Sequence, residues 1–449
     1  FYYVDKGKPP KNKQKFLELI EKYLYDEQVR VNEIMVDKVI AQVDNNLIMT
    51  SYQPFDPSVP QYNLNPVSFM LKFGITDLLE NYKIYGGVRL PFVGIDNNSE
   101  YFITYENLKK RLDKKFTFYR RSLSNTAFNK LPFSNTVLPN GYSIPYSIKT
   151  NYAEVKLSYP LDVLSSVRFG FAFRNDKVVY KSQDKFSLNL PSVSDNWLST
   201  RVEYVFDNCM EAMTNIRYGT RFKVFAEVQK EFPTENKKVS GNYDLPVPKF
   251  NNKVIGVFGF DLRHYQKIYK QIIWANRLAA GASFGTAKMM YYLGGLDNWI
   301  TGPRFDKFDR TTPINYNNGY AFQTLATPVR GFKQNARNGD KFIVFNSELR
   351  IPIFAALINS PIKSDFIKNM QLVGFFDAGT AWEGWSPYSS SNPLFSEEIP
   401  NTTDNPSVIV KVKHYKTPVI MGFGPGIRTS FLGYFLRFDT AWGYDTGEV

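Results

Sequence analysis

The feature that most constrains this chain is an alternation of apolar and polar side chains with a period of two, which recurs along most of its length. In LSTRVEYVFD (residues 198–207), one set of side chains is largely apolar and the other largely charged. The segments TRFKVFAEVQ (residues 220–229) and YFLRFDTAW (residues 434–442) follow the same pattern. Successive side chains of a strand point to opposite faces, so the pattern predicts an all-β chain whose strands have two unlike faces.

Strands of this kind fit a soluble antiparallel sheet or a barrel wall between lipid and a watery lumen. The alternating segments have the length of ~9–11 residues that a tilted strand needs to cross a bilayer. Phe, Tyr and Trp make up 16% of the chain, with 38, 29 and 6 residues. Aromatic girdles at both membrane interfaces account for such a content. We therefore predict a transmembrane antiparallel β-barrel in contact with outer-membrane lipids.

Composition and charge exclude other classes of protein. No apolar run reaches the ~20 residues of a transmembrane helix, so a membrane would be crossed by strands. The chain has 55 Lys+Arg against 42 Asp+Glu, a net charge of +13, but its basic residues form no long block or helical stripe. We therefore predict no nucleic-acid partner. Cys209 stands alone, so an intramolecular disulfide is impossible and a small apolar role is expected.

Two regions differ in pattern. Residues 1–36 contain KNKQKFLELIEKYLYDEQ after a proline-rich start, which predicts a short N-terminal amphipathic helix in a linker. Residues 37–449 carry the period of two and form the predicted barrel. The chain begins with Phe1 rather than Met, so we expect a precursor to have lost its leader.

The connections between strands alternate between short and long, as in barrels with tight periplasmic turns and long external loops. The longest connection, residues 288–339, contains the tetrapeptide VRGF. The alternating segments number about fifteen, whereas single-chain bacterial barrels have even numbers, so about sixteen strands are expected. An open edge in lipid is costly, so either one strand is missing from this sequence or the count of alternating segments is wrong.

The tetrapeptide VRGF places one charged residue, Arg330, among apolar neighbours. In the following strand, KFIVFNSELRIP, the alternation points Glu348 into the lumen, and the next strand, QLVGFFDAGTAW, carries Asp377 among apolar residues. Two inward carboxylates on adjacent strands could hold a guanidinium, whose fork engages both acids. The loop would then be a lid folded into the barrel; the alternative is a surface loop with a solvated arginine.

Four motifs together resemble the BamA-type bacterial surface antigen superfamily of outer-membrane barrels, most clearly between Met290 and Trp442. They are YYLGGLDNW, VRGF, the pair NSELRIP and GFFDAGTAW, and the strand pair GFGPGIRTSFLGYFLRFDTAW. The resemblance implies a lid loop whose tip is Val329, Arg330, Gly331 and Phe332. It also implies that Glu348 and Asp377 are the lumenal partners of Arg330.

The chain departs from that family in two ways. It ends at GYDTGEV, without the family's final strand, and it carries no recognisable periplasmic POTRA domain. A further departure is the stretch between LGG and VRGF, which is longer than in several relatives. We expect the missing strand and the periplasmic region to belong to a longer protein.

No catalytic residue, metal site or cofactor is predicted. His264 and His414 lie far apart in the sequence and form no HxxxH or HExxH spacing. The glycine-rich GFGPG lacks the Lys-Ser/Thr of a phosphate loop and lies inside a strand pattern. Its glycines are expected to relieve crowding in the barrel wall or to permit a kink.

By resemblance, the expected function is non-enzymatic assembly or insertion of outer-membrane proteins, or protein translocation, in the bacterial outer membrane. Expected partners are client or accessory membrane proteins or lipoproteins. The alternative is a structural anchor, a plugged barrel that holds a periplasmic or surface partner in place.

Overall fold

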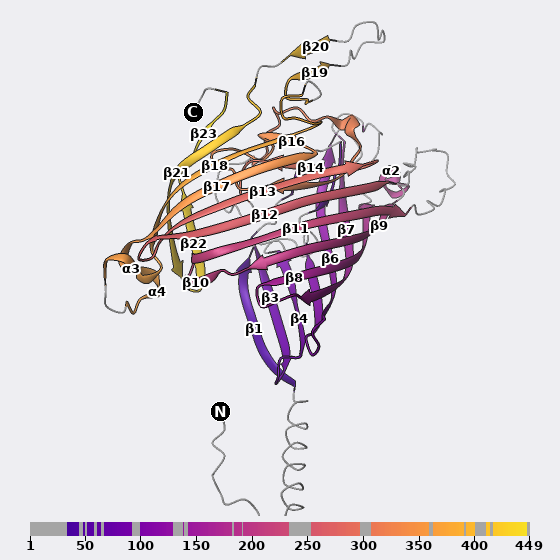
Figure 1. The fold of residues 1–449 in the computed structure, drawn as a ribbon. Coiled ribbons are helices and arrows are strands. Elements are labelled where there is room, and N and C mark those ends of the chain that lie inside the picture. The colour runs from indigo at the N-terminus through magenta and orange to yellow at the C-terminus, as the bar shows by residue number, and fades with distance from the viewer. Residues whose placement is uncertain are drawn as a thin grey trace, which may run out of the picture.

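The computed structural model shows a tilted antiparallel wall around a lumen (Figure 1). It describes residues 34–44, 48–49, 52–57, 61–63, 67–91, 99–128, 138, 142–181, 184–190, 192–232, 253–296, 307–358, 362–389, 392–399, 410–413 and 416–446. We expected a helix within residues 1–36, but residues 1–33 lie outside the described ranges. The first described strand begins at Ile34.

The wall is the largest of the sheets that the structure describes, and its 17 strands are joined by antiparallel pairing. Two of these 17 do not count as separate wall strands. The short β10 (Met210–Met213) only extends one hairpin, and β22 (Tyr434–Asp439) and β23 (Trp442–Tyr444) pair with the same strand, β21, and count as one. The described part therefore has fifteen wall strands. This confirms the count from the alternation. The other wall strands are β1 (Ile34–Asp44), β3 (Ser68–Asp77), β4 (Tyr82–Pro91), β5 (Glu100–Asn107), β6 (Asp113–Phe128), β7 (Ser143–Pro160), β8 (Ser165–Tyr180), β9 (Val193–Asp207), β11 (Ile216–Phe232), β12 (Val254–Tyr269), β13 (Ile272–Gly285), β17 (Lys341–Pro352), β18 (Gln371–Trp382) and β21 (Ile420–Phe431).

The outer face of the wall is apolar along most of its circumference. Large apolar side chains at alternate positions are exposed on strands far apart in the sequence, for example Leu71, Ile103, Phe171, Phe258 and Phe345. An apolar surface of this extent is unfavourable in water and matches a lipid-facing band.

The inner face is charged, and its charges are paired across neighbouring strands. Arg89 on β4 and Arg121 on β6 both bind Glu100 on β5, at 3.0 and 2.9 Å. Arg277 on β13 binds Asp261 on β12 at 2.9 Å. Burial of a charge is tolerated where it is paired, and each of these inward arginines has a carboxylate within reach on a neighbouring strand.

The two ends of the barrel differ. At one end, here the short-turn end, adjacent strands join through tight turns at residues 78–81, 108–112, 161–164, 270–271 and 432–433. Two described connections there are longer. The connection from β9 to β11 contains β10, and the connection from β17 to β18 contains α3 (Ile353–Leu357) and α4 (Asp365–Lys368). The opposite, long-loop end carries α2 (Lys185–Leu188) and the hairpin of β19 (Ser396–Ile399) and β20 (Val410–Lys413). No described helix is long and apolar enough to cross a membrane.

The connection from β13 to β17 forms a second sheet in the mouth of the long-loop end. Its strands β14 (Lys288–Leu293) and β15 (Tyr320–Ala326) run parallel, and β16 (Arg337–Gly339) pairs antiparallel with β14. A 3₁₀ turn, η1 (Tyr316–Asn318), precedes β15. The fourth strand, β2 (Gln53–Pro54), comes from the connection between β1 and β3. We call this sheet, with the tip residues 327–336, the lid.

The lid is held by its own apolar cores. One cluster packs the buried face of β14, including Met289 and Leu293, against Trp197 and Val344 of the wall. A second cluster joins Met290 and Tyr292 of the lid to Phe55 and other side chains of the first connection. Burial of several large side chains at about 1.5–3 kcal/mol each makes the lid an integral part of the fold.

Candidate functional site: the anchored lid and the cavity beneath it

The tip of the lid turns at Gly331, which has a positive φ of 92°. A Cβ atom there would lie 2.7 Å from the backbone nitrogen of Gly443 on β23. Glycine is therefore required both by the backbone conformation and by the close approach of the wall. This turn directs Arg330, which is only 2% exposed, back into the lumen.

Arg330 and Asp377 form the central contact of the site. The Arg330 Nε donates to Asp377 Oδ2 at 2.6 Å, and Nη2 donates to Oδ1 at 2.7 Å. The backbone N–H of Arg330 also donates to Oδ2 at 3.1 Å. Asp377 is completely buried on β18, so this fork-to-fork pairing supplies the counter-charge that a buried carboxylate requires.

The remaining guanidinium nitrogen, Nη1, joins Arg330 to two further carboxylates. It donates to Glu348 Oε1 on β17 at 2.8 Å and to Asp439 Oδ2 on β22 at 3.2 Å. The guanidinium also lies over the ring of Phe375, 3.6 Å from its centroid. Burial alone would lower the pKa of Arg330, but the hydrogen bond and charge of Asp377 raise it, so the lid tip stays charged.

Glu348 is shared among several arginines. Arg428 of β21 donates to both of its carboxylate oxygens, at 3.0 and 2.8 Å. Arg350, two positions along β17, donates to Oε2 at 2.7 Å. One carboxylate thus connects the lid tip to wall strands β17 and β21, and its loss would leave several buried cations without a partner.

The glycine run of β21 makes room for the lid. A Cβ at Gly422 would lie 1.8 Å from the carbonyl oxygen of Arg330, and one at Gly426 would lie 2.1 Å from Asp439 Oδ1. GFGPG is therefore a strand segment, as predicted, and two of its glycines admit the lid backbone and a partner carboxylate.

A second fastening lies beside the tip. Arg337 of β16 donates to the carbonyl of Thr417 and forms an ion pair with Asp445, 2.5 Å apart, beyond β23. At the outer rim, Tyr320 of β15 donates to Glu383, which follows β18. Burial raises the pKa of Glu383 even though the Tyr320 hydroxyl and the Asn315 amide donate to it.

The connection after β1 holds the lid from the other side. Phe55 N–H donates to the Ala321 carbonyl at 2.9 Å. The Gln323 amide donates to the carbonyls of Pro54 and Gln61, at 3.2 and 3.0 Å. The lid is thus attached near both ends of the described wall, to β18–β23 through its arginines and to the β1–β3 connection through β2.

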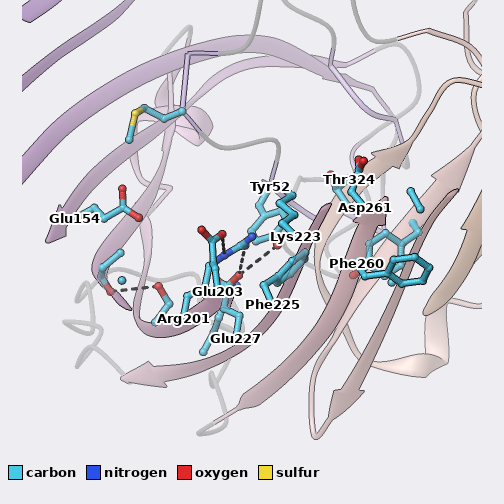
Figure 2. A pocket seen from close by; sticks show the side chains of 18 of the residues that line it. Tyr52, Glu154, Arg201, Glu203, Lys223, Phe225, Glu227, Phe260, Asp261 and Thr324 are labelled. Atoms are coloured by element: carbon cyan, nitrogen blue, oxygen red, sulfur yellow. Dashed lines mark hydrogen bonds and ion pairs between the residues drawn. The ribbon is translucent and has the colours of Figure 1, made fainter. Parts of the chain in front are cut away.

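A cavity of about 440 Å³ lies beneath the lid (Figure 2). Its walls come from β7 to β13 and its roof includes Tyr52, Tyr291 and Thr324. Arg201 forms its charged centre, binding Glu203 at 2.7 Å and Glu227 at 3.0 Å. Paired charges of both signs make this a polar chamber. The described residues contain no group of His, Cys, Asp or Glu that could hold a metal ion.

The structure brings together the residues that the sequence singled out. Val329 is buried in the lid core, and Phe332 packs against the same cluster and close to Gly443. Sequence reasoning missed Asp439, although YFLRFDTAW showed it alternating with apolar residues in the same way as Glu348. It also missed Arg428 and Arg350, whose inward positions follow from the same period of two.

Three side chains of potentially reactive types, Ser283, His264 and Cys209, lie in environments that indicate a structural role. We predicted no catalytic residue in part because we placed no serine in a G-x-S-x-G context, and that was wrong, since GASFG (residues 281–285) has this spacing. Ser283 nevertheless lies buried within β13, and its hydroxyl accepts from the Met289 N–H. His264 bonds Thr220 across β11 and β12 at 2.8 Å, whereas His414 lies outside the described residues. Burial raises the pKa of the Cys209 thiol to about 11.

The fold and the lid define a β-barrel with an arginine-anchored plug in its lumen. BamA from Haemophilus ducreyi lacking POTRA domains 1-3 aligns with 95% of this chain and 78% of its own, at 11% identity and a TM-score of 0.46. CdiB from Acinetobacter baumannii aligns with 95% of this chain and 65% of its own, at 14% identity and a TM-score of 0.45.

A third similar structure is BauA, the ferric preacinetobactin receptor from Acinetobacter baumannii. It aligns with 92% of this chain and 63% of its own, at 9% identity and a TM-score of 0.36. No protein-family model and no curated protein matches the chain.

Proposed function

We propose that this chain is the barrel of a non-enzymatic outer-membrane protein that assists the assembly, insertion or translocation of other proteins. The observation that carries this proposal is the lid tip, where Arg330 occupies a site formed by Glu348, Asp377 and Asp439. The short-turn end would face the periplasm and the lid the outside. Arg330 and its partners would hold lid and wall in one arrangement and take part in no chemical step.

The wall supports this proposal where its first and last described strands meet. A hydrogen bond from the Val43 N–H on β1 to the Tyr434 hydroxyl on β22, 3.0 Å long, links the two sides. The described pairings place β1 beside β3 and give it no ladder with β22 or β23. A loosely joined seam would let a client strand pair with β1 in an insertase.

A second candidate is a structural anchor, favoured by the attachment of the lid on both sides of the lumen. In an anchor, the barrel would remain plugged and would hold a periplasmic or surface partner. Fold alone does not separate these classes, because function lies in sites and partners.

Depletion of the full-length protein, followed by quantitative proteomics of the outer membrane, separates the two. A general insertase gives a broad fall in unrelated barrels, whereas an anchor gives the loss of one or a few proteins. An unchanged outer-membrane proteome would contradict both.

A further inference from the structure

The connection between β17 and β18 stands apart from its neighbours at the short-turn end. The adjacent turns at residues 270–271 and 432–433 are tight, but this connection contains α3 and α4. We call its described part, residues 353–358 and 362–370, the foot. Figure 1 shows α3 and α4 at the left edge of the wall, beyond the ends of the strands.

The foot folds over the outer face of the wall. On β21 the outward positions include the exposed Ile427 and Phe431, and Thr429 lies between them on the same face. Thr429 is nevertheless only 4% exposed, and its hydroxyl donates to the Phe366 carbonyl at 2.7 Å. The rings of Phe366 and Phe431 also meet edge to face, with centroids 6.1 Å apart. Helix α4 therefore covers the side of β21 that belongs to the lipid-facing band.

A different element covers the lumen at this end. The turn between β10 and β11 reaches the inward residues of the wall, where Arg350 donates to the Asn215 carbonyl at 2.8 Å. The Gln371 amide donates to the Thr214 carbonyl, also at 2.8 Å. The foot and this turn therefore lie on opposite sides of the wall, so the foot is not a lumenal plug.

The foot exposes apolar side chains that have no cover within the described chain. Leu357 is 75% exposed, and Ile358 and Ile367 are also exposed. The adjoining Leu432 of the β21–β22 turn is 80% exposed. These side chains continue the outward band of the wall, represented nearby by Leu372, beyond the strand ends. Such a cluster is unfavourable in water and favourable at the boundary of acyl chains and headgroups.

Basic side chains accompany this apolar surface. Lys363 and Lys368 are exposed on the foot, and Lys270 of the adjacent turn donates to the Ala356 carbonyl at 3.2 Å. The outward Trp274 and the exposed Tyr269 lie on the same side of the barrel end. An apolar helix face with aromatic rings nearby is typical of a segment at the membrane interface. Lysines beside such a face can form ion pairs with the phosphates of anionic phospholipids.

We infer that the foot is an interfacial anchor that binds anionic phospholipid headgroups in the leaflet at the short-turn end of the barrel. Its apolar side chains enter the headgroup boundary, and Lys363 and Lys368 contact the phosphates. This inference rests on the proposed membrane-spanning barrel, whose short-turn end would face the periplasm.

The test uses the whole chain, reconstituted in vesicles of phosphatidylethanolamine and phosphatidylglycerol, with Cys209 replaced by Ala. A nitrobenzoxadiazole label is placed in the foot at Ile367→Cys, and its quenching by spin-labelled lipid is measured. Leu372→Cys, in the outward band, reports membrane insertion of the barrel. Val163→Cys, at a fully exposed position in a tight turn at the same end, gives the quenching expected of a label that stays in water.

The expected result is strong quenching at Leu372 and Ile367 and weak quenching at Val163. Quenching at Leu372 but not at Ile367 overturns the inference about the foot and leaves the membrane-spanning barrel standing. Absence of quenching at Leu372 contradicts the membrane placement on which both proposals rest.

The role of the lysines is measured as the preference of the label at Ile367 for spin-labelled phosphatidylglycerol over spin-labelled phosphatidylcholine. A lysine near an anionic surface contributes about 1 kcal/mol, so each change, Lys363→Gln or Lys368→Gln, should reduce this preference by about five-fold. Lys177→Gln, on β8 away from the foot, is the matched control. An unchanged preference in both foot variants overturns headgroup binding.

Discussion

Two buried arginine networks of this barrel differ in what they connect. In the N-terminal wall, Glu100 lies between Arg89 and Arg121, its register partners on the adjacent strands. In the C-terminal part, Arg330 comes from the lid and binds Asp377 and other carboxylates on strands with which its backbone forms no ladder. Both networks are almost fully buried, so burial alone does not distinguish them.

The difference shows how the same pairing has two structural uses. The Glu100 network reinforces strands that backbone hydrogen bonds already hold in register. The Arg330 network instead fixes one loop relative to the wall, and the lid tip depends on it for position. Variants of the two networks should therefore separate wall stability from lid position.

The largest effect is expected for Arg330→Ala. This change leaves Asp377 buried without its guanidinium partner, and breaking such a network costs about 3–5 kcal/mol. Urea unfolding from vesicles measures the cost, and hydrogen exchange of residues 327–334 measures release of the lid tip. Unchanged exchange in this segment, together with unchanged unfolding, would show that the apolar cores hold the lid without the arginine.

Arg330→Lys should have the next largest effect. Lysine keeps the charge but cannot form the two parallel hydrogen bonds to Asp377, and we expect a loss of about 2–3 kcal/mol with partial exposure of the lid tip. The same two measurements apply. A lysine variant indistinguishable from wild type would mean that charge alone, rather than the planar fork, anchors the tip.

Gly422→Ala should disturb the lid from the side of the wall. The added Cβ would lie 1.8 Å from the Arg330 carbonyl oxygen, and overpacking of this kind costs about 1–3 kcal/mol. Gly374→Ala on the adjacent strand is the control, because a Cβ there meets no atom within 4 Å. Equal effects of the two alanines would argue against close packing of the lid on β21.

Glu100→Gln should have the smallest effect on the lid. Loss of this carboxylate leaves Arg89 and Arg121 without their shared charge and should destabilise the wall by about 1–3 kcal/mol. Exchange of residues 327–334 should stay at the wild-type rate under native conditions. Faster exchange in the lid tip would show that the two networks are coupled through the wall.

The local features of the barrel follow from the alternation of its side chains. The period of two fixes which side chains share a face of a strand, so the fifteen wall strands and the inward positions of Glu348 and Asp377 could be predicted. The arginine of VRGF suggested a buried partner, but a surface loop with a solvated arginine remained open, and the lid tip followed from the resemblance of the motifs.

The contacts between distant groups depend instead on how the strands and connections are arranged in space. Asp439 and Arg428 join the site because β21 pairs with β18 and β22 pairs in turn with β21, and a period of two does not encode the neighbour of a strand. Pairing of β2 with β15 likewise depends on the path of a connection across the lumen. The foot folds outward because Phe366 meets the outer face of β21, a contact between segments far apart in the sequence. The local alternation determines which face of a strand each side chain occupies, whereas the arrangement of the strands in the closed sheet determines which distant side chains come into contact.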